Sequence, residues 1–181
     1  KDIAFGPANM GLDEGEIKER TLYAADLVGI DKTLLEKSPF DLSGGQKRRV
    51  AIAGVVAMSP KILILDEPAA GLDPAGKEEI LCKIKDLHRR MNITVILISH
   101  SMEDIAKLAE RIVVLKSGKI ISDGSTTATF GNKMMLSDAG LSVPQITEIC
   151  DELKKLGVPL PEGIFSVERA ASELIKVFKT K

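Results

Sequence analysis

The sequence has few cysteines, no excess of either charge and no long apolar run. Its two cysteines, Cys82 and Cys150, are far apart and lack metal-ligand spacing, so we expect neither a disulfide framework nor a zinc site. Lysine and arginine number 25 against 26 aspartates and glutamates, without the basic excess of proteins that coat nucleic acid. The longest apolar run, residues 50–58, is far shorter than the roughly 20 residues of a membrane-spanning helix.

The composition is otherwise that of an ordinary folded protein. The sequence is 44% hydrophobic and 28% charged, unlike disordered or fibrous chains. Its 181 residues suffice for one compact domain or for one domain with a small appendage. With so little cysteine, we predict a protein of the reducing cytosol. The sequence opens on Lys1 within what we expect to be a structured segment, so we interpret it as a piece of a longer chain.

The residues before position 60 carry helical patterns. A helix is predicted over residues 14–28, because Asp13 and Glu16 have the spacing of a capping box and Gly29 ends the apolar stripe. A second helix is predicted to begin after Ser43 and to continue to about residue 58.

From residue 60 the pattern alternates between strand and helix. Short apolar runs of this kind predict strands that are buried on both faces. In order, we expect strand 61–65, helix 74–90, strand 93–98, a helix opened by Ser101, and strands 112–115 and 120–122. This order is typical of an α/β fold around a parallel sheet. Further helices are predicted over residues 144–156 and 166–178.

Residues 42–46 read Leu-Ser-Gly-Gly-Gln and form the most informative local motif. Ser43 and Gln46 alone predict a capping box at the start of a helix. Gly44 and Gly45 each cost a helix roughly 1 kcal/mol relative to alanine. They would also present bare backbone N–H groups to an anion at the positive end of the helix dipole. The motif alone leaves two interpretations open, a well-capped helix and a phosphate site.

Asp66 and Glu67 directly follow the first predicted strand. Open α/β sheets bind ligands beyond the carboxyl ends of their strands, and a carboxylate there suits a Mg²⁺ ion that keeps its water shell. Glu67 would orient or deprotonate a water molecule. Two solvated acids at the end of a strand are the alternative interpretation.

Two further residues complete the candidates. Asp73 has the position of a helix N-cap, whatever else it does. His100 follows a predicted strand, where a histidine can hydrogen-bond a phosphate oxygen or a catalytic water, with a satisfied loop residue as the alternative. We interpret the basic run at residues 47–49 as one solvated helix face.

The order and spacing of these motifs resemble those of the ATP-binding cassette ATPases. The resemblance runs from the signature motif at residues 42–46, through the strand that ends at Asp66 and Glu67, to residues 71–73 and His100. It implies an α/β fold, the C-terminal part of a P-loop NTPase. Such a fold has a parallel sheet core, a helical signature subdomain and a C-terminal helical extension.

The resemblance also implies that ATP is bound between two subunits. Ser43 and Gly45 would contact the γ-phosphate of ATP held by the opposite subunit of a head-to-tail dimer, with Gly44 and Gln46 in the same binding motif. Asp73 would communicate across the dimer.

The catalytic roles follow from the same resemblance. Asp66 would hold Mg²⁺ through its water shell, Glu67 would act as general base or position the water, and His100 would contact the γ-phosphate. The reaction would be phosphoryl transfer to water, which depends on positioning and charge stabilisation.

The phosphate-cradling loop of the family, G-x-x-x-x-G-K-[ST], has no counterpart here. Gly6 and Gly11 have the glycine spacing, but Leu12 follows. The glutamine-bearing loop and the aromatic residue that stacks on adenine also lack a candidate, and in the family all three precede the segment that matches Lys1. We therefore expect this chain alone to bind ATP poorly, to hydrolyse almost none, and to self-associate through the gap in its sheet.

Residues 2–12, 48–57, 141–149 and 156–160 resemble the ATPase subunits of energy-coupling factor importers, which move cobalt, nickel or vitamins. The resemblance implies three parts: a helical subdomain with the signature motif over residues 1–59, an α/β core over 60–125 and a C-terminal helical extension over 126–181.

The importer resemblance implies ATP and Mg²⁺ as cofactors. It implies as partners a second ATPase subunit, identical or paralogous, and integral membrane transporter subunits, with no nucleic acid. The protein would then lie peripherally on the cytoplasmic face of the cell membrane.

Two other functions remain open. A non-transport cassette ATPase, such as a translation factor or a DNA-repair ATPase, would need a basic nucleic-acid surface or a long coiled-coil insertion, and the spacing between Gln46 and Asp66 is too short for one. A non-catalytic dimerisation or docking module is the second alternative.

Overall fold

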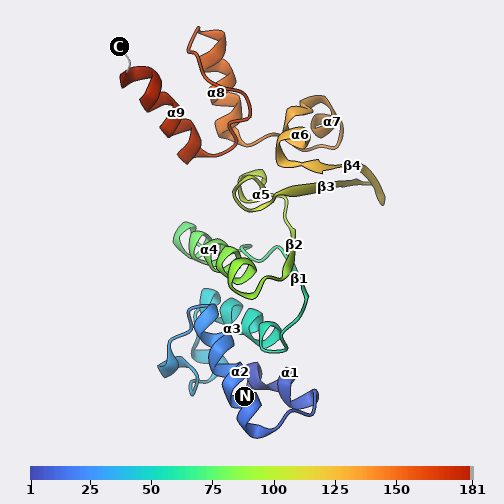
Figure 1. Cartoon of the computed structure of the whole chain (residues 1–181), viewed down its shortest axis with the longest axis vertical. Coiled ribbons are helices and arrows are strands. Elements are labelled where there is room, and N and C mark those ends of the chain that lie inside the picture. The colour runs from blue at the N-terminus through green and yellow to red at the C-terminus, as the bar shows by residue number, and fades with distance from the viewer. Residues whose placement is uncertain (180–181) are drawn as a thin grey trace. The chain divides into compact units, whose positions relative to one another are not determined.

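The computed structural model describes residues 1–179. Their contacts form two compact units, one of Lys1–Ile98 and one that starts at Ser99, and Figure 1 traces the chain from the N-terminus in blue to the C-terminus in red. The contacts thus divide the chain at one position, and the three functional parts expected from the sequence stay a prediction. Across the described residues, every helix falls short of the length or the apolar character needed to cross a bilayer.

The first unit, all of which is described, is mainly helical. Its elements are α1 (Asp2–Asn9), α2 (Glu14–Leu27), the 3₁₀ turns η1 (Lys32–Leu34) and η2 (Pro39–Asp41), α3 (Gly44–Val56), β1 (Ile62–Asp66), α4 (Pro74–Met91) and β2 (Thr94–Ile98). The sequence predicts α2, α3 and α4 with closely similar bounds. For the residues of α1 it predicted a structured segment, without specifying a helix or a strand.

Local side-chain chemistry explains where these helices begin and end. Asp13 caps α2, since its carboxylate accepts the N–H of Glu16 at 2.9 Å, a bond whose loss typically costs about 1 kcal/mol. Gly29 follows the end of α2 with φ +69°, a left-handed conformation that glycine adopts without steric cost. Both features confirm the predicted bounds of this helix.

The two strands of the first unit are parallel and are connected through α4. Ile62 pairs with Thr94 and Asp66 pairs with Ile98, so the carboxyl ends of β1 and β2 lie side by side. This pairing confirms the predicted α/β arrangement for the first two strands and brings the segments after Asp66 and Ile98 to one edge of the sheet.

The predicted burial of these strands on both faces is wrong. Leu63 and Leu65 are buried, but Ile62 and Ile64 are 56% and 62% exposed. β2 likewise alternates between exposed and partly buried side chains. The reason is that, within the first unit (residues 1–98), no second layer covers the face of the sheet that carries the isoleucines.

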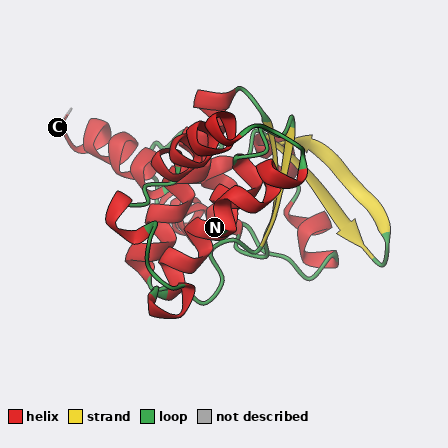
Figure 2. Cartoon of the chain, turned by 90° about the horizontal axis from the view of Figure 1, so that it is seen from below, coloured by secondary structure: helices red, strands yellow, loops and turns green. Residues whose placement is uncertain are grey.

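The second unit combines a hairpin with short helices. Its described elements are α5 (Met102–Leu108), β3 (Arg111–Lys116), β4 (Lys119–Ser125), α6 (Thr126–Gly131), α7 (Lys133–Asp138), α8 (Gln145–Lys155) and α9 (Val167–Lys179). The strands of the described chain therefore form two separate pairs, drawn in yellow in Figure 2.

The third predicted strand does not extend the parallel sheet. β3 pairs with β4 in an antiparallel hairpin, with Lys116 opposite Lys119. Ser117 and Gly118 between them have φ values of +49° and +75°, as in a type I′ turn, whose twist matches that of a hairpin. The two-residue turn sends the chain straight back, which explains the antiparallel pairing.

The helices α6 and α7 occupy a stretch for which the sequence predicted no element. Ser125 Oγ accepts the N–H of Ala128 at 3.2 Å, and Asn132 Oδ1 accepts that of Met135 at 3.1 Å. Each short helix thus has a side-chain N-cap, and these two polar residues were the signal available in the sequence.

The second unit has its own apolar core. Cys150, Leu160, Ile164 and Ala170 form a buried cluster, and the rings of Phe130 and Phe165 lie 5.2 Å apart. The Thr147 hydroxyl donates a hydrogen bond of 2.8 Å to the buried carbonyl of Ile164, which ties α8 to the segment before α9.

Candidate functional site

The N-terminus of α3 is held by the predicted capping box. Ser43 Oγ accepts the N–H of Gln46 at 3.3 Å, and Gln46 Oε1 accepts the N–H of Ser43 at 2.9 Å. The first N–H groups of a helix have no partner within the helix. Those of Gly44 and Gly45 have no backbone or side-chain partner among residues 1–179 either.

Packing within the chain does not explain the two glycines. A Cβ atom added to Gly44 or Gly45 would meet nothing within 4 Å. At Gly6, by contrast, a Cβ would come within 2.6 Å of the Met58 side chain, so close packing accounts for that glycine. The end of α3 therefore carries two costly glycines in open space, with free N–H groups at the positive end of the helix dipole. An approaching anion would be bound there.

The second predicted motif lies at the end of β1. Asp66 is the last residue of the strand and is exposed, while Glu67 is half-buried. The N–H of Glu67 donates to the carbonyl of Ile98 at 2.9 Å, which continues the ladder to β2. Glu67 has φ +45°, a region that non-glycine residues rarely occupy and that is concentrated at functional sites.

A short loop connects Glu67 to Asp73. The carbonyl of Glu67 accepts the N–H of Ala70 at 3.1 Å, and Gly71 has φ +73°. Asp73 Oδ1 accepts the N–H of Gly76 at 2.8 Å, which confirms that Asp73 is the N-cap of α4. Glu67 and Asp73 thus lie at the two ends of one short loop.

The basic run after the signature motif is not a single solvated face, so that expectation is wrong. Arg48 Nη2 donates to the carbonyl of Ala70 at 3.3 Å, and Arg49 forms an ion pair of 2.6 Å with Glu79 on α4, leaving Lys47 exposed. Successive helical residues are rotated by about 100°, so three in a row cannot face the same way. The structure thereby brings α3 and the loop after Glu67 into contact.

His100 lies in the second unit and is exposed. Ser101 beside it caps α5, because its hydroxyl accepts the N–H of Asp104 at 3.4 Å, and Ser99 Oγ accepts the N–H of Ser101 at 3.1 Å. The expected contact of His100 with the γ-phosphate stays a prediction.

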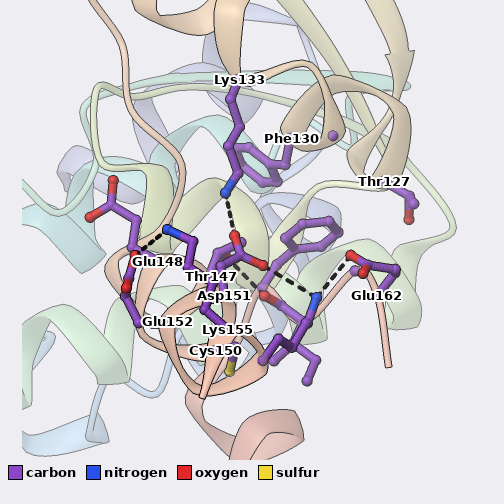
Figure 3. A pocket seen from close by; sticks show the side chains of 15 residues that line it. Thr127, Phe130, Lys133, Thr147, Glu148, Cys150, Asp151, Glu152, Lys155 and Glu162 are labelled. Atoms are coloured by element: carbon purple, nitrogen blue, oxygen red, sulfur yellow. Dashed lines mark hydrogen bonds and ion pairs between the residues drawn. The ribbon is translucent and has the colours of Figure 1, made fainter. Parts of the chain in front are cut away.

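The second unit also contains an open cavity of about 780 Å³. Its lining comes from α6, α7 and α8 and from residues 162–165, and Figure 3 shows the charged side chains around it. None of the predicted site residues lines it. Lys133 and Lys154 both pair with Asp151, and Lys154 also reaches Glu162 at 2.8 Å.

These contacts shift the ionisation of the cavity's charged groups. Burial raises the pKa of Asp151, but hydrogen bonds from Lys133 and Lys154 outweigh it, so the net pKa lies below the usual value. The hydrogen bond to Glu162, aided by Asp151, raises the pKa of Lys154. The ion pairs therefore keep Asp151 and Lys154 charged, and the opposite charges of these two side chains offset each other.

Comparisons with known proteins agree with the motifs. Residues 10–70, which include both the signature motif and Asp66–Glu67, match the ABC transporter family. The energy-coupling factor transporter ATP-binding protein EcfA2 of Caldanaerobacter subterraneus subsp. tengcongensis is 55% identical over 99% of this chain and 63% of that protein.

Two solved structures are also similar. The first is cbiO1 from Clostridium perfringens, described as part of the ABC transporter complex cbiONQ. It has 38% identity and a TM-score of 0.67, over 82% of this chain and 59% of that one. The second is a dimeric ATP-binding cassette in a post-hydrolysis state, bound to ADP and Pi. It has 30% identity and a TM-score of 0.55, over 64% of this chain and 49% of that one.

In sequence and in fold, this chain is therefore similar to members of the ABC transporter family. Within that family it is similar to the ATP-binding subunits of energy-coupling factor transporters, and it spans about 63% of the length of the curated relative described above.

Proposed function

We propose that this chain is part of the ATP-binding and ATP-hydrolysing subunit of an ABC-type importer for a metal ion or a vitamin. The observation that carries the proposal is the end of α3, where Gly44 and Gly45 have free N–H groups and open space around them. A phosphate group is the ligand that such a helix end favours.

In this proposal the phosphate belongs to ATP held by a second subunit. Ser43 and Gly45 contact its γ-phosphate, Gln46 keeps the helix end in shape through the capping box, and the absence of side chains at Gly44 and Gly45 lets the phosphate approach the backbone. The dimeric, ADP- and Pi-bound state of the related cassette supports a two-subunit site.

Glu67 acts as the general base, or positions the attacking water, in the subunit's own site. A half-buried carboxylate at a strand end suits this role, and the hydrogen bond to Ile98 fixes its backbone. His100 contacts the γ-phosphate from the segment after β2, and Asp73 communicates across the dimer from the far end of the loop.

Asp66 holds Mg²⁺ in this proposal. Protein sites for Mg²⁺ usually provide one or two carboxylates, with phosphate oxygens and water completing the shell. Asp66 fits such a site, since it is an exposed carboxylate at a strand end, and residues 1–179 contain no cluster of three or more His, Cys, Asp or Glu that would form a full cage. The bound ion would neutralise charge on the phosphates.

The importer assignment is supported by the names of the relatives. The similar EcfA2 is an energy-coupling factor transporter subunit, and cbiO1 is described as part of a transporter complex. We infer that this protein pairs with an identical or paralogous ATPase, binds integral membrane subunits on the cytoplasmic face, and passes the energy of ATP to them by opening and closing. Cobalt, nickel and vitamins are the proposed substrate classes.

The substitution Glu67→Gln tests the hydrolytic role. It should be made in a protein of the relatives' full length that carries this sequence, hereafter the full-length ATPase. We expect phosphate release to fall by about a hundredfold or more, the range for losing a general base, while ATP binding and an ATP-dependent dimer persist. Phosphate release and size-exclusion chromatography with ATP measure the two effects.

Glu36→Gln is the matched control, because Glu36 is exposed and lies outside both motifs. It should leave turnover unchanged. Phosphate release by Glu67→Gln at the normal rate would remove Glu67 from the catalytic role, and an absence of ATP binding by the unsubstituted protein would refute the proposed function as a whole.

A further inference from the structure

Arg48 makes a contact that the proposed function leaves unused. It lies on α3, the helix whose first residues are proposed to meet the partner's nucleotide, and its Nη2 donates to the carbonyl of Ala70 at 3.3 Å. Ala70 lies on the loop between Glu67 and Asp73, which belongs to the subunit's own site. Arg48 therefore connects residues assigned to two different nucleotides.

The acceptor of this bond lies on a turn that begins at Glu67. The Glu67 carbonyl accepts the N–H of Ala70, so one residue, Ala70, is hydrogen-bonded to Glu67 through its N–H and to Arg48 through its carbonyl. A displacement of α3 would thereby be transmitted to Glu67 through a single residue, Ala70.

Resting on the proposed function, we propose that Arg48 is a positioning residue that couples the signature motif to Glu67. When Ser43 and Gly45 engage the nucleotide on the partner, Arg48 holds the loop so that the Glu67 carboxylate takes its catalytic position. Hydrolysis in one site then depends on engagement of the other through this hydrogen bond.

The neighbouring arginine shows why Arg48 is the residue that couples. Arg49 pairs with Glu79 on α4 and is 14% exposed, so it fastens α3 to the body of the unit. Arg48 reaches the loop instead. Glu67 holds a left-handed backbone conformation, which persists only where its surroundings enforce it, and Arg48 supplies one such constraint from outside the loop.

The test uses Arg48→Ala in the full-length ATPase. We expect kcat to fall about tenfold or more, the scale for misplacing a catalytic group, with KM for ATP and ATP-dependent dimerisation within about twofold of normal. Arg48→Lys should restore at least half of the turnover, because a lysine ammonium can also donate to one carbonyl.

Two controls separate positioning from folding. Lys47→Ala removes the same charge from the preceding, exposed residue and should leave kcat unchanged. Amide hydrogen exchange of residues 69–72 should become faster in Arg48→Ala and stay unchanged in Lys47→Ala, with equal thermal midpoints for both variants.

The outcomes distinguish this inference from the proposed function. If the unsubstituted protein hydrolyses ATP and Arg48→Ala does so within twofold of it, the coupling role is refuted and the proposed function stands. Unchanged amide hydrogen exchange of residues 69–72 in Arg48→Ala also refutes the coupling, whatever the activity. If the unsubstituted protein neither binds nor hydrolyses ATP, the proposed function fails instead.

Discussion

The end of α3 and the cavity of the second unit are two regions of the described chain that gather groups able to bind a charged ligand. At the end of α3, the N–H groups of Gly44 and Gly45 have no partner among the described residues, and space around them is open. In the cavity, Lys133 and Lys154 are paired with carboxylates. The N–H groups of the first region are therefore available to an outside ligand, whereas the lysines of the second region are engaged in ion pairs within the chain.

This difference shows that the size of a hollow is a poor guide to function here. The three lysines that line the cavity of about 780 Å³ are all paired with carboxylates, and these ion pairs hold α7, α8 and the segment at Glu162 together. The end of α3 lines neither that cavity nor its walls, yet it carries N–H groups without a partner among residues 1–179 and two glycines that packing within the chain does not explain.

We expect the largest effect from a substitution at the end of α3. Ser43→Arg in the full-length ATPase places a long side chain over the end of α3, and we expect it to abolish the ATP-dependent dimer and to lower ATP hydrolysis by about a hundredfold or more. Size-exclusion chromatography with ATP and phosphate release measure the loss.

A loss of the helix cap must be separated from this blockage. Asp13→Ala removes a comparable cap, that of α2, at a similar cost of about 1 kcal/mol, and should leave the dimer intact. A normal ATPase rate for Ser43→Arg would show that the signature motif does not meet a nucleotide.

A smaller change at the end of α3 separates the effect on folding stability from the effect on ATP hydrolysis. Gly45→Ala should raise the free energy of unfolding by about 0.5–1 kcal/mol, since alanine favours the helix and its Cβ meets no atom. The same methyl group should lower ATP hydrolysis about tenfold or more by keeping the phosphate from the backbone. Denaturant unfolding and phosphate release measure both effects, and a variant that is more stable yet fully active would contradict the phosphate site.

The smallest expected effect lies in the second region. Asp151→Asn should lower the free energy of unfolding near neutral pH by about 1 kcal/mol or less, the range for partly exposed ion pairs, and should leave ATP hydrolysis unchanged. Because the folded-state pKa of Asp151 is depressed, its stabilisation is present above the unfolded value of about 3.9 and is lost as the pH falls through the folded pKa.

Urea unfolding near pH 7 and near pH 2 checks this sign. The difference between the variant and the unsubstituted protein should be full at the first pH and smaller at the second, because Asp151 becomes protonated as the pH falls through its folded-state pKa. Glu152→Gln, which removes an exposed pair with Lys155, is the matched control and should change less. A loss of ATP hydrolysis in Asp151→Asn would show that the cavity has a functional role.

Features that depend on a few neighbouring residues were predictable from the sequence. The capping box of Ser43 and Gln46 and the N-caps Asp13 and Asp73 are fixed by side chains that bond to backbone a turn away, and each was expected and found. The positions of Asp66 and Glu67 after a strand follow from the apolar run before them.

Features that depend on distant segments were not predictable in the same way. The exposure of Ile62 and Ile64 depends on what covers the sheet, and the composition of a strand does not reveal this. The partners of Arg48 and Arg49 lie more than twenty residues away, so only the folded chain identifies them. Ser117 and Gly118 did carry a hairpin signal in the sequence, but only the pairing of β3 shows that the turn ends the parallel sheet.

The open isoleucines of the β1–β2 sheet have a practical consequence for handling this chain. The hydrophobic attraction between apolar surfaces becomes stronger on warming near room temperature and in sulfate or phosphate solutions, and it becomes weaker in the cold. Ile62, Ile64, Ile96 and Ile98 form a water-exposed strip of this kind. Low temperature and weakly precipitating salts are therefore the conditions in which this face best tolerates contact with solvent.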